Sequence, residues 1–112
     1  MEVHFATKKL AETLTHDKAR AKTYGDVLAK KIAIRINALK AAERLEDLRH
    51  VAGRCHELRG NRAGQLAVDL TGNLRLVFRP TEDPPPANPS GGLDWVEVKA
   101  VTVLEVTDYH GD

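Results

Sequence analysis

The 112-residue sequence predicts an α+β fold in which an N-terminal helical hairpin packs on a small twisted, mainly antiparallel β-sheet. Three patterns predict it. Apolar residues recur at helical spacing between residues 17 and 42, they alternate with polar residues between 54 and 79, and β-branched residues dominate the run from 95 to 108. A chain of this length buries one core between a helix layer and a sheet layer, so we expect a single domain over residues 1–112.

The first half of the chain predicts a short strand followed by helices. Residues 2–5 alternate between polar and apolar, which indicates a strand, and a helical pattern follows over residues 8–14. The long helix runs from about residue 17 to 42, and its apolar face consists of Tyr24, Leu28, Ile32, Ile36 and Leu39. Val27 and Ile34 fall on a flank of that face, which predicts contacts with both the sheet and the preceding helical segment.

The start of the long helix has two interpretations. It begins at Asp17, or it begins or bends at Gly25, where Thr23 and Asp26 resemble a start signal. Residues 43–50 predict one or two further helical turns that bury Leu45 and Leu48.

The central stretch, residues 54–79, predicts three strands. The segment with His56 and Leu58 enters a loop bracketed by Gly60 and Gly64. Two alternating runs follow, residues 65–70 and 74–79, and the intervening Thr-Gly-Asn segment is a short-turn signal, so these runs form a hairpin.

The last third of the chain begins with a proline-rich segment. Prolines lack a backbone donor, so residues 80–92 are expected to form a long exposed loop, either a surface insertion or a partner-binding segment. The run from Trp95 to Asp108 predicts a final strand that pairs inside the sheet.

Charge is unevenly distributed along the chain. Residues 1–65 contain 14 Lys and Arg against 8 Asp and Glu, whereas residues 66–112 contain 3 against 8. This asymmetry fits either a basic surface for a polyanion or ordinary solvated helices. On charge alone, the residues expected to meet RNA phosphates are Lys8, Lys9, Lys18, Lys22, Lys30, Lys31 and Arg35.

The cysteine content and the hydropathy of the sequence indicate the expected cellular compartment. The single cysteine, Cys55, excludes an internal disulfide and is expected to be a core thiol in a reducing compartment. No apolar run is long enough for a signal peptide or a membrane span, so a cytoplasmic protein with no membrane contact is expected.

Three motifs occur in series: H-x-L-x-G-x-R-x-G from His56 to Gly64, G-N-x-R from Gly72 to Arg75, and a terminal D-Y-H at residues 108–110. Together they resemble the HigB branch of the RelE/ParE toxin superfamily over nearly the whole chain. The resemblance implies a RelE-like fold and the toxin of a bacterial type II toxin–antitoxin module. It also implies cleavage of messenger RNA on the ribosome without a metal or cofactor, and a helix-turn-helix antitoxin as partner. The sequence departs from this pattern in its long proline-rich insertion and in the two residues that follow His110.

Metal-free RNA cleavage needs a base for the attacking 2′-hydroxyl, an acid for the departing 5′-oxygen, and positive charge at the phosphate, and it yields a 2′,3′-cyclic phosphate. His56 and His110 are the expected proton carriers, with the roles of acid and base open between them. Arg62 and Arg75 are expected to hold the phosphate. Tyr109 is expected to stack on a base or donate a proton.

Two residues are expected to support this site. Asp108 would orient His110, and Asn73 would either contact RNA or hold the hairpin turn. A zinc site built from Cys55, His56 and His110 is disfavoured, because adjacent strand residues point to opposite faces and the chain has no second cysteine. Two alternative functions remain: a ParE-like inhibitor of DNA gyrase that is not a nuclease, and a catalytically silent regulatory binding protein of the killer-suppression type.

Overall fold

The computed structural model describes residues 1–108 of the chain, and it combines one five-stranded sheet with a helical layer. The strand order is β1-β5-β4-β3-β2, with β1 parallel to β5 and the other neighbours antiparallel. In chain order the elements are β1 (Glu2–Phe5), α1 (Lys8–Thr15), α2 (Asp17–Ala41), η1 (Leu45–His50), β2 (His56–Glu57), η2 (Gly60–Arg62), β3 (Leu66–Asp69), β4 (Leu74–Pro80) and β5 (Ala100–Asp108). The predicted fold class is therefore confirmed.

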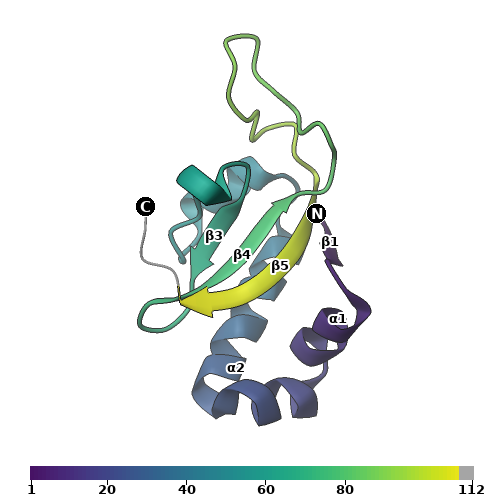
Figure 1. The fold of residues 1–112 in the computed structure, drawn as a ribbon, viewed down its shortest axis with the longest axis vertical. Helices are drawn as coiled ribbons and strands as arrows, with labels where there is room; N and C mark the ends of the chain where they lie inside the picture. Colours follow the sequence, from purple (N-terminus) through teal and green to yellow (C-terminus); the bar gives the residue numbers. More distant parts are fainter. Residues whose placement is uncertain (109–112) are drawn as a thin grey trace.

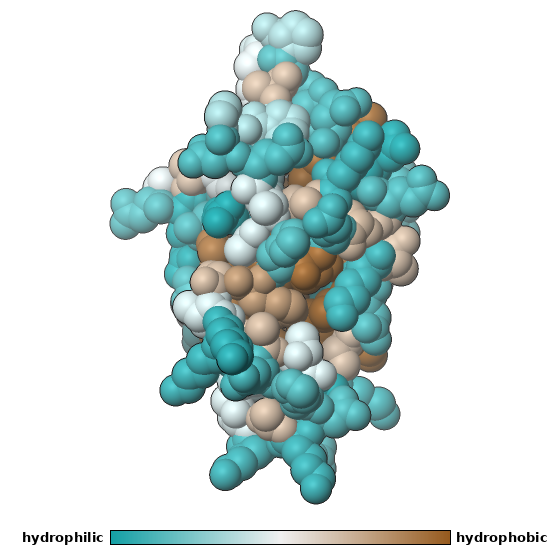
Figure 2. Space-filling view, turned by 90° about the vertical axis from the view of Figure 1, so that its right-hand side faces the viewer, coloured by the Kyte–Doolittle hydropathy of each residue, from teal (hydrophilic) through white to brown (hydrophobic). Residues whose placement is uncertain are grey.

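The helices cover one face of the sheet, and the short 3₁₀-helix η2 lies on the other (Figure 1). The main core sits between the sheet and the helices and includes Ile32, Ile36 and Leu39 of α2, together with Leu76 and Phe78 of β4. Apolar residues form a band midway along the molecule when it is viewed from the side of β1 and α1, with hydrophilic residues above and below (Figure 2).

Helix α2 combines both interpretations of its start. It begins at Asp17, and it bends at Gly25, whose φ of 78° and ψ of 163° are non-helical. Glycine accepts that positive φ without the clash that a Cβ atom would cause. The predicted apolar face is confirmed, because Ile32, Ile36 and Leu39 are buried and Tyr24 and Leu28 pack against the core.

Helix α2 contacts both the sheet and α1, as predicted, but the flank formed by Val27 and Ile34 does not make these contacts. Val27 is 78% and Ile34 48% exposed, so neither is buried by the sheet or by α1. Helix α1 faces α2 along a groove that Leu14, Ala33 and Ile36 help to line. A helix turns about 100° per residue, which places Val27 and Ile34 on the outer side once Ile32 and Ile36 face the sheet.

The final strand is shorter than predicted. It comprises Ala100–Asp108, and Trp95 instead opens a turn that precedes it. This turn pairs with η1: the amide of Leu45 donates to the Val98 carbonyl at 2.9 Å, and the amide of Glu46 donates to the Trp95 carbonyl at 3.1 Å. Trp95 and Val98 are buried by this contact, which explains why the apolar pattern extended beyond the strand.

Strand β5 contains a bulge opposite β4. Val77 pairs with Glu105 but its neighbour Phe78 pairs with Val103, so Leu104 is the extra residue. Such a bulge shifts the alternation by one position. It keeps Val103 on the helical side and turns both Leu104 and Glu105 toward the opposite face of the sheet.

Most of the segment predicted as an exposed loop is one. Pro80 still closes β4, and the chain then extends beyond the end of the sheet, away from the helical hairpin (Figure 1). An isolated bridge between Ala87 and Leu93 closes the extension. No helix within residues 1–108 is long and apolar enough to cross a membrane.

Candidate functional site

The face of the sheet away from the helices, called here the open face, carries a second and much smaller core. Leu58, Ala67 and Val77 are buried there, and Leu104 packs against them. Strand pairing arranges the residues of this face in two neighbouring rows. One row contains His56, Ala67, Val77 and Glu105, and the other contains Asp69, Arg75 and Thr107.

His56 lies in the first row, on the two-residue edge strand β2. Its Nδ1 atom is 2.7 Å from the carbonyl oxygen of Arg54. A carbonyl oxygen only accepts, so Nδ1 carries the proton and Nε2 is the unprotonated nitrogen of the neutral ring. Arg54 itself has a φ of 49°, and it is the one non-glycine residue among residues 1–108 with positive φ.

Cys55 points to the opposite side of the strand, as predicted, and packs against the main core. Burial raises the pKa of the Cys55 thiol to about 12, while the charge of Arg49 lowers it and that of Glu57 raises it further. The thiol therefore stays protonated and unreactive at neutral pH.

Arg62 projects from η2 onto the open face. Its Nη1 atom is 2.9 Å from a carboxylate oxygen of Glu105 and 3.1 Å from the side-chain oxygen of Gln65. The flanking Gly60 and Gly64 have φ of 61° and 91°, so the glycine-bracketed loop adopts backbone angles that other residues rarely tolerate. These angles turn Arg62 back over the sheet.

Arg75 lies in the second row, at the start of β4, and only 14% of its side chain is exposed. Its Nε atom is 2.9 Å from the Asp69 carboxylate, which also binds Arg54 at 3.1 Å. Adjacent strands lie about 4.8 Å apart and residues two positions apart about 6.8 Å, which places the Cα atoms of His56 and Arg75 about 12 Å apart. Three of the predicted site residues, His56, Arg62 and Arg75, therefore share one face of the sheet.

The remaining predicted site residues lie at the end of the sheet or beyond the described chain. Asn73 is exposed in the hairpin turn, and Asp108 is exposed at the end of β5, where it pairs with Leu74. Tyr109 and His110 lie outside the described residues, so their predicted roles stay predictions. The turn itself is explained by Gly72, whose φ is 56°.

The predicted RNA-binding cations lie on helices α1 and α2, which pack on the other face of the sheet (Figure 1). Five of the lysines are exposed, and Lys31 is partly exposed. Arg35 is committed to the fold, because it donates to the carbonyl oxygens of Asp69 at 2.8 Å and Ala52 at 3.2 Å. The basic helices and the open face are thus two separate surfaces.

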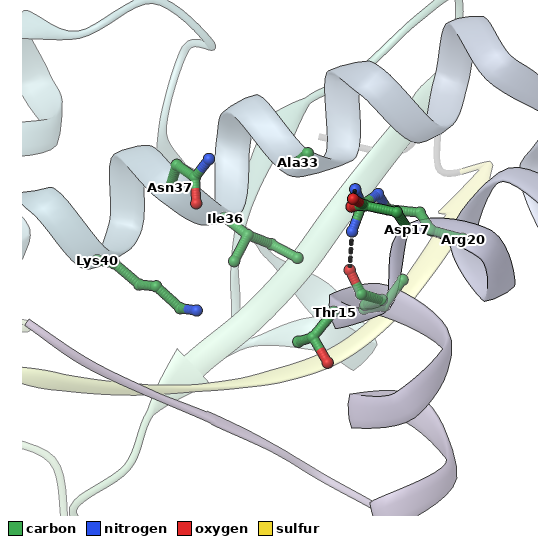
Figure 3. Close-up of a pocket in the computed structure, with 8 residues that line it drawn as sticks. Thr15, Asp17, Arg20, Ala33, Ile36, Asn37 and Lys40 are labelled. Carbon is green, nitrogen blue, oxygen red and sulfur yellow. Dashed lines mark hydrogen bonds and ion pairs between the residues drawn. The ribbon is translucent and has the colours of Figure 1, made fainter.

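One cavity lies beside the open face, and another lies between the two helices. A cavity of about 470 Å³ lies at the outer edge of β2 and is lined by Arg49, His56 and Arg59, among others. A cavity of about 220 Å³ lies between α1 and α2, where the guanidinium of Arg20 donates to the Leu14 carbonyl at 2.9 Å and binds Asp17 at 2.6 Å (Figure 3). The larger one borders a predicted site residue. No group of three or more His, Cys, Asp or Glu residues within residues 1–108 is arranged to hold a metal ion.

Three residues of the open face were not singled out from the sequence: Arg54, Asp69 and Glu105. A signal for Asp69 was present, because the hairpin register places it opposite Arg75 on the same face. Glu105 reaches Arg62 from a strand that is 43 residues away in the sequence, so only the bulged register of β5 reveals that pair.

Comparisons with known proteins address the fold. No protein-family model and no curated protein matches the sequence. Among solved structures, the YoeB/ParE toxin from Agrobacterium tumefaciens aligns with a TM-score of 0.55 at 13% sequence identity, over 98% of this chain and 100% of that one. A likeness at this level of identity reports shared architecture. The chain has the α+β fold of a YoeB/ParE toxin.

Proposed function

We propose that this chain is the toxin of a bacterial type II toxin–antitoxin module, of the HigB branch, and that it cleaves messenger RNA on the ribosome without a metal. The observation that carries the proposal is that His56, Arg62 and Arg75 lie on the same face of the sheet. The likeness to a YoeB/ParE toxin supports it independently of these residues.

The proposed chemistry begins at His56. The 2′-oxygen of the substrate attacks the adjacent phosphorus, the bond to the 5′-oxygen breaks, and a 2′,3′-cyclic phosphate and a 5′-hydroxyl result. The bond from Nδ1 to the Arg54 carbonyl directs Nε2 of neutral His56 to accept the 2′-hydroxyl proton. His110 or Tyr109 then donates a proton to the leaving oxygen, and Asp108 orients His110.

Arg62 and Arg75 hold the phosphate in this proposal. Both are ion-paired in the free protein, to Glu105 and Asp69 respectively. A guanidinium has five donors, so one carboxylate leaves donors for phosphate oxygens. The carboxylates also hold the side chains over the sheet before RNA binds, which reduces the entropy lost on binding.

The partners follow from the same proposal. The exposed lysines of α1 and α2 bind ribosomal RNA phosphates, and a helix-turn-helix antitoxin neutralises the toxin in the cytoplasm. An adjacent reading frame for a short helix-turn-helix protein is the expected genomic sign of such a module.

A second candidate is a ParE-like inhibitor of DNA gyrase. One observation favours it: both predicted phosphate-binding arginines are paired with carboxylates, which a protein that only binds a partner would also tolerate. If the chain is instead a catalytically silent regulator, we expect the same ion pairs, and we expect no growth arrest when the chain is expressed.

Primer-extension mapping of cellular messenger RNA after induction tests these functions. We expect cuts with the wild-type chain and with the control His50→Ala, because His50 is exposed on η1 and outside the open face. We expect the cuts to vanish with His56→Ala, Arg75→Ala and His110→Ala. Growth arrest with DNA damage and no RNA cuts would support the gyrase inhibitor instead, and absence of both would support the silent regulator.

A further inference from the structure

Asp69 occupies the centre of the polar network on the open face. Its carboxylate binds the guanidinium of Arg75 at 2.9 Å, and it binds that of Arg54 through two contacts at 3.1 and 3.3 Å. Its backbone groups also form hydrogen bonds. The Asp69 amide donates to the Gly53 carbonyl at 2.7 Å, and the Asp69 carbonyl accepts from Arg35 at 2.8 Å. One residue therefore connects the segment before β2, the start of β4 and helix α2.

The contact with Arg54 bears directly on His56. Arg54 has a left-handed backbone with a φ of 49°, a conformation that is strained for a non-glycine residue. That conformation places the Arg54 carbonyl 2.7 Å from His56 Nδ1. The two contacts from Asp69 hold the side chain of the residue whose backbone is strained.

Stability alone is a weak reason for this arrangement. Partly exposed ion pairs add little to stability, and the Arg54 side chain is 56% exposed. Two guanidinium groups sharing one carboxylate keep a formal charge of +1, so the cluster attracts a phosphate even though its arginines are held in place.

We propose that Asp69 is a positioning residue: through Arg54 it keeps His56 in the Nδ1–H form, and through its own ion pair it sets the Arg75 guanidinium. Asp69 acts on both groups at once, through its contacts with Arg54 and Arg75. The catalytic consequence rests on the proposed nuclease function, whereas the effect on the His56 ring does not.

The test measures the tautomer of His56 directly. Long-range ¹H–¹⁵N correlation of the full-length ¹⁵N-labelled protein distinguishes a neutral ring protonated at Nδ1 from one protonated at Nε2. We expect the wild type to show the Nδ1–H form and Asp69→Asn to show a mixture of both forms.

Two further variants keep the test decisive. Arg54→Gly removes the guanidinium but accepts the same φ, so it reports the loss of the contact without added backbone strain, and we expect the same mixture. Glu46→Gln removes the carboxylate of a comparable ion pair, with Arg49 on η1, and we expect the wild-type spectrum. If Asp69→Asn fails to fold, Arg54→Gly decides. Unchanged His56 tautomers in the folded variants would overturn the proposal.

Cleavage assays then separate this proposal from the proposed function. Misplacing a catalytic group lowers the rate steeply, so we expect Asp69→Asn to lose about 10-fold in cleavage rate at saturating RNA, with Glu46→Gln at the wild-type rate. A wild-type chain that cuts no RNA but shows the expected tautomer change would refute the nuclease and support the role of Asp69. Normal cleavage together with an unchanged tautomer in Asp69→Asn would support the nuclease and refute the role of Asp69.

Discussion

The two faces of the sheet are held by different forces. Among residues 1–108, 16 buried residues form the main core on the helical side, whereas the apolar cluster on the open face contains three. There, most polar side chains are engaged by ion pairs and by hydrogen bonds to backbone carbonyls. Burial of apolar area stabilises a small domain far more than exposed ion pairs do. The helical face therefore supplies most of the folding energy, and the open face is available for function.

The largest expected effect tests that difference at two adjacent residues. Phe78 and Val77 are both fully buried, but Phe78 faces the helices and Val77 faces the smaller core. Phe78→Ala should lower the free energy of unfolding by about 3 to 5 kcal/mol, and Val77→Ala by about half of that, because less volume is removed. Urea unfolding followed by circular dichroism measures both. A loss for Val77→Ala as large as that for Phe78→Ala would show that the core of the open face contributes more than its size suggests.

Gly53 joins the two faces, and its substitution should have the next largest effect. Its φ is 119°, and an added Cβ atom would lie 2.9 Å from Nε of Arg35, the side chain of α2 that binds the Asp69 carbonyl. Gly53→Ala should therefore cost about 2 kcal/mol through backbone strain and displacement of Arg35. Gly25→Ala is the control for strain alone, because no atom lies near its added Cβ. A smaller loss for Gly53→Ala than for Gly25→Ala would contradict the close contact.

Glu105→Gln should have a small effect on stability and a larger one on RNA binding. The carboxylate is 46% exposed, so losing its pair with Arg62 should change the free energy of unfolding by less than about 1 kcal/mol. Removing one negative charge should raise RNA affinity and steepen its dependence on salt. Filter binding at several salt concentrations measures this. Weaker binding would indicate that Glu105 positions Arg62 more than it competes with phosphate.

Cys55 should contribute no pH dependence to the free energy of unfolding near neutral pH. Burial raises its pKa from 9.0 to about 12, so the folded state favours the protonated thiol. The stability that this provides is fully present below pH 9.0 and is lost as the pH rises toward 12. Alkylation by iodoacetamide at about pH 8 should be much slower in the folded protein than in urea. Equal rates would place Cys55 outside the core.

The periodicity of apolar residues in the sequence predicted a large part of this fold. The alternation of residues 65–79 predicted the β3–β4 hairpin, and it placed Arg75 on the face opposite Leu76 and Phe78. The helical stripe from Leu28 to Leu39 predicted the face of α2 that covers the sheet. Both follow from local geometry, since side chains alternate along a strand and recur every three to four residues along a helix.

Tertiary structure alone decided how distant residues meet. The β5 bulge brings Glu105 to Arg62, and packing against η1 converts the start of the predicted last strand into a turn at Trp95. The exposure of Val27 and Ile34 depends on how far α2 is rotated against the sheet. Register, rotation and a left-handed residue such as Arg54 depend on the packing of all the elements together, and no short stretch of sequence carries that information.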